Sequence, residues 1–128
     1  MIFRKKKILL IEDDLAVVRI LETKLEIEGY EVLSAYNGKT GLEKVMKEKP
    51  NLILLDILLP KMNGFEVLRK IKENSETSSI PVMILSNLGE DENINRGIKL
   101  GAKDYIVKAH YNLEEIVRKI RQILSHPV

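Results

Sequence analysis

The sequence predicts an α/β protein, a doubly wound three-layer sandwich of five β-α units around one parallel five-stranded sheet. Two observations lead to this fold class. Short, almost purely apolar runs recur along the chain, and segments with helical spacing of apolar residues separate them. At 128 residues, with 45% hydrophobic residues, the chain is long enough for one domain with a sizeable core.

Four runs have the character of buried strands. A strand that helices cover on both faces does not alternate polar and apolar residues, and these runs do not alternate. A fifth stretch, Glu31–Tyr36, mixes polar and apolar residues and is expected to be an edge strand. The four apolar runs are Ile8–Ile11, Leu52–Leu55, Val82–Leu85 and Tyr105–Val107.

The segments between the strands carry helical patterns. Gly29 offers a stop after the first helix, and Asn112 with Glu115 resembles a capping box at the start of the last one. The segment between Glu90 and Leu100 is the weakest, because it contains few apolar anchors and several poor helix formers. The apolar helical positions are Val17, Val18, Leu21 and Leu25; Leu42, Val45 and Met46; Phe65, Leu68 and Ile71; Ile94 and Ile98; and Ile116, Val117, Ile120, Ile123 and Leu124.

Composition narrows the class of protein. We expect a single domain over residues 1–128, with a basic arm at 1–6 and a frayed tail at 125–128. The absence of Cys excludes disulfides and thiolate metal sites, and no apolar run approaches the roughly 20 residues of a membrane span, so a cytoplasmic location is expected. The net charge is +2 with 2 Phe, 4 Tyr and no Trp, which favours neither nucleic-acid nor membrane binding by this domain.

Polar residues follow the predicted strands in a consistent way. The first strand ends in Glu12 and Asp13, the third in Asp56, the fourth in Ser86 and the fifth in Lys108. The carboxyl ends of parallel strands lie at one edge of the sheet, where such folds bind ligands at the point of strand-order reversal. In the flavodoxin-like order 2-1-3-4-5 this point lies between the first and third strands, so the three carboxylates are expected to meet there.

Gathered carboxylates repel one another unless a cation lies among them. An all-oxygen cluster suits a hard ion such as Mg²⁺, and with Ser86 and Lys108 nearby it suits phosphoryl transfer to a carboxylate. Each residue alone has an ordinary interpretation: Asp14 is expected to cap a helix, and Tyr105 to be a core residue with its hydroxyl at the surface. The combined placement at successive strand ends favours the functional interpretation. A serine triad is much less favoured, because neither His of the chain has an evident partner.

The motifs make a family resemblance recognisable. From Lys7 to about Leu124, the chain resembles the receiver domain of bacterial two-component response regulators, related to the chemotaxis and transcriptional regulators. The motifs that carry the resemblance are Ile8–Asp14, Leu54–Glu66, Pro81–Ser86 and Gly101–Lys108.

The resemblance implies a role for each site residue. Asp56 would accept a phosphoryl group from a phosphohistidine on a sensor kinase. Asp13 and Asp56 would ligate Mg²⁺, Glu12 would act through a bound water, and the backbone carbonyl of Leu58 would complete the protein ligands. Lys108 would pair with the aspartyl phosphate.

The resemblance also implies a switch. Ser86 would hydrogen-bond a phosphoryl oxygen and free space for Tyr105 to turn inward, which repacks the face made by the fourth helix, fifth strand and fifth helix. That face would contact a downstream protein or a second copy of the chain. Such a domain is not a metabolic enzyme: it promotes its own phosphorylation and slow autodephosphorylation only.

Two departures from the family pattern concern the loops around the site. Ala109 follows Lys108 where the family usually has Pro in a cis peptide, so we expect a trans bond with altered loop geometry or a strained exception, and the placement of the lysine is in question. Asn87 follows Ser86 where the family favours a small residue, and its amide could crowd or shield the phosphoryl site.

Two alternatives stay open from the sequence. The first is a pseudo-receiver, an interaction module that works without phosphorylation. The second is a Mg²⁺-dependent phosphohydrolase on a similar fold, which commonly carries a second acid two residues after the nucleophile. Asp56-Ile57-Leu58 lacks that acid.

Overall fold

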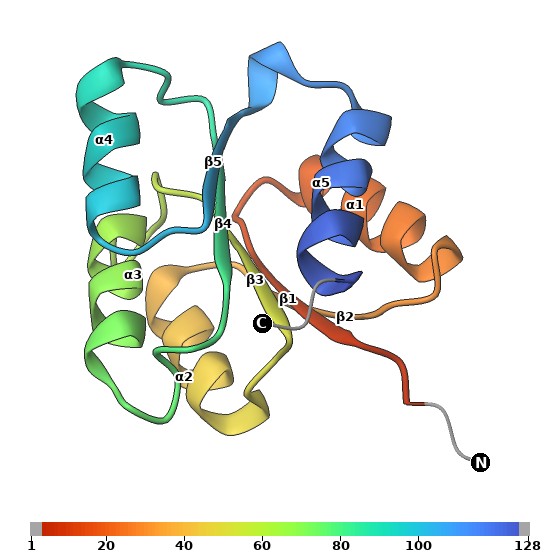
Figure 1. Cartoon of the computed structure of the whole chain (residues 1–128), viewed down its shortest axis with the longest axis horizontal. Helices are drawn as coiled ribbons and strands as arrows, with labels where there is room; N and C mark the ends of the chain where they lie inside the picture. The colour runs from red at the N-terminus through yellow and green to blue at the C-terminus, as the bar shows by residue number, and fades with distance from the viewer. Residues whose placement is uncertain (1–3, 126–128) are drawn as a thin grey trace.

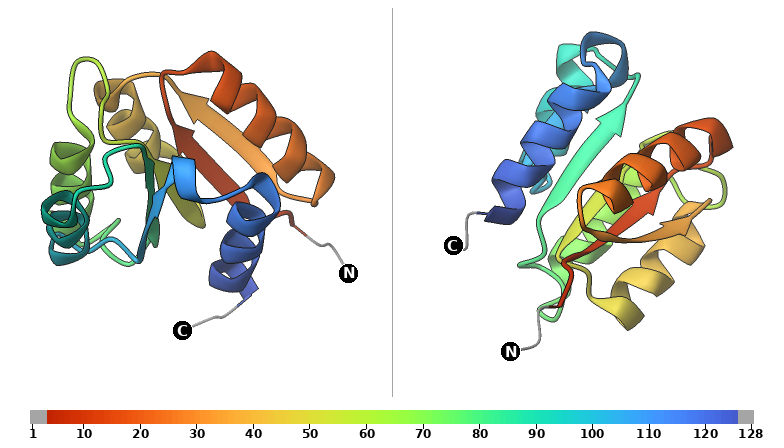
Figure 2. Two further views of the ribbon diagram at one scale, coloured as in Figure 1. Left: turned by 90° about the horizontal axis from the view of Figure 1, so that it is seen from above. Right: turned by 90° about the vertical axis from the view of Figure 1, so that its right-hand side faces the viewer.

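Five strands form one parallel sheet in the order β2-β1-β3-β4-β5, in a computed structural model that describes residues 4–125. The predicted topology is therefore confirmed, and the mixed stretch from Glu31 does lie at an edge of the sheet. The strands visible in Figure 2 point the same way, so their carboxyl ends lie along one edge. The strands are β1 (Lys7–Ile11), β2 (Glu31–Ala35), β3 (Leu52–Leu55), β4 (Val82–Ser86) and β5 (Asp104–Val107).

Helices cover both faces of the sheet, as the doubly wound prediction requires. Figure 1 shows α1 and α5 on one side of the strands and α2, α3 and α4 on the other. None of these helices, within the part of the chain that is described, has the length and apolar character needed to cross a membrane. The helices are α1 (Leu15–Ile27), α2 (Gly38–Glu48), α3 (Gly64–Glu73), α4 (Asp91–Lys99) and α5 (Leu113–Ser125), with a short 3₁₀ turn η1 (Lys108–His110) before α5.

Local hydrogen bonds explain where the helices begin. The carboxylate of Asp14 accepts from the Ala16 amide at 3.0 Å, so Asp14 caps α1 as predicted. Asn112 and Glu115 accept from each other's backbone amides at 2.8 and 2.9 Å. This reciprocal pair is the capping box expected at the start of α5.

The helix ends agree less closely with the prediction. Gly29 has a φ of +98° directly after the C-cap of α1, as expected for a glycine stop. The predicted tail from Ser125 is wrong by one residue, because α5 continues through Ser125 while Leu124 packs into the core. Residues 126–128 of that tail, and 1–3 of the basic arm, lie outside the described residues. Within the arm, residues 4–6 have no regular structure and are exposed.

The core is divided by the sheet into two apolar clusters. Successive residues of β1 point to opposite faces, so Leu10 packs with α1 and α5 while Ile11 packs with α2 and α3. All four residues of β3 are fully buried, which accounts for its unbroken apolar run. The helix with the thinnest anchoring is α4, in which only Gly97 is buried, as its sequence suggested.

A matched pair of truncations tests this division between core and surface. Ile71 of α3 is 0% exposed, whereas Ile27 at the end of α1 is 73% exposed. We expect Ile71→Ala to lower the free energy of unfolding by about 3 kcal/mol, because it removes buried methyl groups and leaves a cavity. The same change at position 27 is expected to stay within about 0.5 kcal/mol. Urea denaturation measures both, and equal losses would contradict the packing described.

Candidate functional site

Two neighbouring strands bring three carboxylates together. Glu12 and Asp13 directly follow β1, and Asp56 directly follows β3, its neighbour in the sheet. The Asp56 amide donates to the Ile11 carbonyl at 3.0 Å, so the ladder between these strands continues up to the site. Carboxylate oxygens of Glu12, Asp13 and Asp56 all lie within 4.8 Å of one another. The predicted convergence at the carboxyl edge of the sheet is therefore present.

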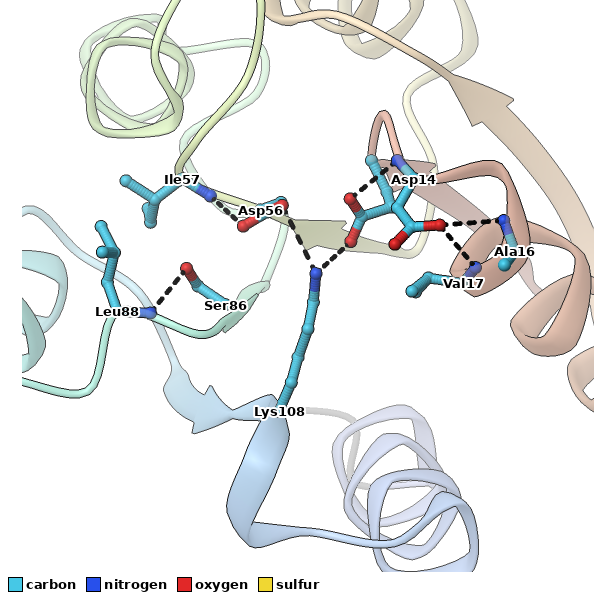
Figure 3. Close-up of polar contacts among 9 residues, drawn as sticks. Asp14, Ala16, Val17, Asp56, Ile57, Ser86, Leu88 and Lys108 are labelled. Carbon is cyan, nitrogen blue, oxygen red and sulfur yellow. Dashed lines mark hydrogen bonds and ion pairs between the residues drawn. The ribbon is translucent and has the colours of Figure 1, made fainter.

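Lys108 reaches these carboxylates from the edge strand β5. Its side chain extends toward Asp56, as Figure 3 shows, and its Nζ lies 3.4 Å from Asp56 Oδ2 and hydrogen-bonds Glu12. The peptide bonds of the described residues are all trans, so Ala109 follows Lys108 through a trans bond at the start of η1. The Pro-to-Ala departure therefore alters the loop without removing the lysine from the site.

Burial and charge perturb the ionisation of this cluster. Glu12 is 2% exposed, and its burial raises the pKa of the carboxyl to about 7, with the nearby Asp56 acting in the same direction. Hydrogen bonds from Lys108 and the Asp14 amide oppose part of that rise. Burial also lowers the pKa of the Lys108 ammonium, but the two carboxylates outweigh it and the net shift is upward.

The ligand chemistry of the cluster suits a hard divalent cation. Asp13 is exposed to solvent, whereas Glu12 and Asp56 are buried beside it, so the site offers oxygen ligands with access from water. One oxygen of Asp56 also accepts from the Ile57 amide at 2.7 Å, which fixes the carboxylate in place. The side chain of Leu58 is 61% exposed, and its carbonyl as a further ligand stays a prediction.

Ser86 and Tyr105 meet at a residue that the sequence did not single out. The hydroxyl of Ser86 accepts from the Leu88 amide at 3.2 Å, and the Tyr105 hydroxyl donates to the Leu88 carbonyl at 2.6 Å (Figure 3 shows the first contact). Tyr105 is 7% exposed, as expected for a core residue, and its hydroxyl is bonded at Leu88. Burial raises the pKa of this hydroxyl, and the nearby Ser86 hydroxyl opposes part of the rise.

Nothing in the sequence marked Leu88, since an apolar residue in a loop has no chemical signal of its own. Ser86 shares no hydrogen bond with Asp56 among the residues described, although both end neighbouring strands. Asn87 is exposed, and the predicted influence of its amide on the site stays a prediction.

Comparison with known proteins agrees with this geometry. The family model of the response regulator receiver domain matches residues 8–121. The chain belongs to this family. The receiver is 42% identical to a probable transcriptional regulator, ycf27, of Galdieria sulphuraria, over 94% of this chain and 46% of the relative. It thus spans about half the length of the curated relatives it matches.

Solved structures show the same receiver architecture. A CheY-like response regulator receiver domain from Methanospirillum hungatei is 34% identical, with a TM-score of 0.88 and 95% of each chain covered. The Mn²⁺-bound form of response regulator Rcp1 is 31% identical, with a TM-score of 0.80, 94% of this chain covered and 92% of that one. These matches confirm the fold and the family predicted from the sequence.

The raised pKa of Glu12 predicts a pH-dependent stability of the metal-free receiver. The folded value of about 7 lies above the ordinary value of 4.5, so protonation favours the folded state. This contribution is complete below the ordinary pKa and is lost as the pH rises through about 7. Relative to Glu12→Gln, which stays neutral, the wild type should lose up to about 3 kcal/mol of unfolding free energy between about pH 5 and pH 8.

Urea denaturation of both proteins at a series of pH values, in the presence of a chelator, measures this difference. Using the variant as reference cancels the titration of the groups that do not interact with Glu12. Parallel stability curves for the two proteins would show that Glu12 ionises normally in the folded receiver.

Proposed function

We propose that this receiver is a phosphorylation-activated switch of a two-component system, which accepts a phosphoryl group on Asp56 from a phosphohistidine of a sensor kinase. The observation that carries the proposal is the placement of Glu12, Asp13 and Asp56 within 4.8 Å, with the Lys108 ammonium 3.4 Å from Asp56. Buried carboxylates are rarely gathered so closely without a cationic partner. Here the arrangement provides a carboxylate nucleophile, metal ligands and a fixed positive charge at one place.

Each site residue has its own role in the proposed phosphoryl transfer. A carboxylate oxygen of Asp56 attacks phosphorus, the bond from phosphorus to the imidazole nitrogen of the donor breaks, and the imidazole leaves with the electron pair. Asp13 and Asp56 would hold Mg²⁺, with Glu12 acting through water and the Leu58 carbonyl as a further ligand. When bound, the ion neutralises charge on the phosphoryl oxygens. That a similar structure is the Mn²⁺-bound form of response regulator Rcp1 supports the proposal that this receiver binds a divalent cation.

Lys108 supplies the second positive charge. Its ammonium already lies between Glu12 and Asp56, so it reaches a phosphoryl oxygen on Asp56 with a small side-chain movement. The trans bond to Ala109 leaves this reach intact. Catalysis by the receiver is limited to its own phosphorylation and a slow dephosphorylation, and no metabolite is turned over.

The contacts of Leu88 suggest how phosphorylation is transmitted. Ser86 holds the amide of Leu88 and Tyr105 holds its carbonyl. When the Ser86 hydroxyl turns to a phosphoryl oxygen, it releases the Leu88 amide. The loop before α4 then loses one of the two hydrogen bonds that Leu88 makes with Ser86 and Tyr105. Because α4 is thinly anchored, the face formed by α4, β5 and α5 then repacks.

The proposed partners act on opposite sides of this switch. A sensor kinase or phosphotransfer protein approaches the exposed carboxylate edge, and a downstream protein or a second receiver contacts the α4-β5-α5 face. The curated relatives named as transcriptional regulators are about twice as long as this chain. We propose that the receiver forms one domain across residues 1–128 and acts through protein contacts, without binding DNA itself.

Removal of the acceptor carboxylate tests the proposal directly. With acetyl phosphate and Mg²⁺, we expect the wild type to gain one phosphoryl group and Asp56→Asn to gain none, because an amide is a poor nucleophile. Intact-mass spectrometry measures the product. Omission of Mg²⁺ should suppress the reaction in the wild type.

Asp14→Asn is the matched control. Asp14 lies next to the site but serves as the cap of α1, and Asn is an equally good cap. This variant should be phosphorylated like the wild type. Phosphorylation of Asp56→Asn would contradict Asp56 as the acceptor, and no phosphorylation of the wild type would be evidence for a receiver that works without phosphotransfer.

Ser86→Ala separates phosphorylation from transmission. The variant lacks the hydroxyl but keeps the carboxylates and Lys108, so it should still take up a phosphoryl group on Asp56. We expect its α4 and β5 amides to show a smaller change in NMR chemical shift on phosphorylation than those of the wild type. Full-sized shifts in the variant would rule out a role for the hydroxyl in the switch.

A further inference from the structure

The loop between β3 and α3, which carries Leu58, contains a backbone outlier. Lys61 has a φ of +67°, and the Met62 amide donates to the Pro60 carbonyl at 2.7 Å. A hydrogen bond between residues two apart around a residue with positive φ defines a γ-turn, which is rare and strained for a residue with a side chain. Such a conformation persists only where the surrounding structure holds it.

The first residue of α2 supplies a restraint on this turn. The Gly38 amide donates to the Pro60 carbonyl at 3.2 Å, so this carbonyl accepts hydrogen bonds from two amides, those of Gly38 and Met62. A Cβ atom at Gly38 would lie 1.9 Å from the Met62 carbonyl oxygen and 2.7 Å from its carbonyl carbon. The contact is therefore backbone against backbone, and no flexible side chain can yield to relieve it. Asn37 fixes the position of Gly38 by capping α2 through the Thr40 amide at 2.8 Å.

The other end of the loop is held in the same manner. The Gly64 amide donates to the Ile57 carbonyl at 2.8 Å, and a Cβ atom at Gly64 would lie 2.2 Å from the Asp56 carbonyl oxygen. The segment that contains Leu58 is thus held by close backbone contacts on both sides, at Gly38 and at Gly64. Gly64 belongs to α3, the helix that directly follows the loop. Gly38 belongs to α2, which is not joined to the loop in the sequence.

We propose that Gly38 is a positioning residue for the phosphorylation site: by its amide and its lack of a side chain it clamps the γ-turn of residues 60–62, and so holds the loop that presents Leu58 beside Asp56. The inference deepens the proposed function, since it assigns α2 a part in forming the cation site. Gly38 itself touches neither the carboxylates nor the ion. It acts through the backbone of the loop alone.

Gly38→Ala tests the clamp, with Gly41→Ala as the matched control. Both changes add one methyl group within α2, but at Gly41 the atoms nearest to the added Cβ belong to the side chain of Ile11, at 2.8 Å, and not to the backbone of the loop. In the metal-free protein, we expect exchange of the amide hydrogens of residues 58, 59, 61 and 62 to become faster in Gly38→Ala and to stay unchanged in Gly41→Ala. Mg²⁺ titration followed by NMR, without phosphodonor, should give binding about tenfold weaker in Gly38→Ala only.

A second variant keeps the test valid if the first does not fold. Asn37→Ala removes the cap that fixes Gly38 but adds nothing to the contact with Met62. We expect this variant also to show faster amide exchange in the loop and weaker Mg²⁺ binding, with both changes smaller than in Gly38→Ala.

The outcomes distinguish the clamp from the proposed function. If the wild type binds Mg²⁺ and the Gly38 and Asn37 variants match it in affinity and in loop exchange, the clamp is disproved while the proposed function stands. Equal losses in the Gly38 and Gly41 variants would also overturn the clamp, because any disturbance of α2 would then suffice. Failure of the wild type itself to bind Mg²⁺ would instead remove the proposed function.

Discussion

Electrostatic repulsion among Glu12, Asp13 and Asp56 is the constraint to which the rest of this structure responds. Holding three carboxylates within 4.8 Å at the end of a buried sheet is unfavourable unless positive charge compensates. In the metal-free receiver, Lys108 compensates in part, while burial, with Asp56 acting in the same direction, raises the pKa of Glu12 to about 7. In the proposed function, a divalent cation would compensate the charge that Lys108 leaves unbalanced, and would also balance the negative charge of the phosphoryl group.

The carboxyl edge of the sheet also links the carboxylate cluster to the face formed by α4, β5 and α5. Ser86 ends β4, Tyr105 lies within the neighbouring strand β5, and both bond the backbone of Leu88 in the loop that leads to α4. A rearrangement at the carboxylates therefore needs to move only one hydroxyl to release a helix that is held by few buried residues. Low local stability of α4 makes it suitable for a switch.

Close contacts between backbone segments make the site rigid on the side of the loop between β3 and α3. The loop after Asp56 is held at Gly64 and at Gly38, where the close approach leaves no room for a side chain. These contacts explain why a γ-turn with a Lys at positive φ is maintained beside the carboxylate cluster. Loops that carry function are often positioned in this way by the rigid elements around them.

The sequence by itself determined the alternation of strands and helices, the edge position of β2, the caps at Asp14 and Asn112, and the convergence of Glu12, Asp13, Asp56 and Lys108, because each follows from local patterns or from the geometry of parallel strands. Only the tertiary structure decided that the Tyr105 hydroxyl is bonded at Leu88, that Lys108 keeps its place before Ala109, and that Gly38 meets Met62. These depend on close approach between segments far apart in the chain. No local periodicity encodes such distances, since they arise only when the helices pack onto the sheet.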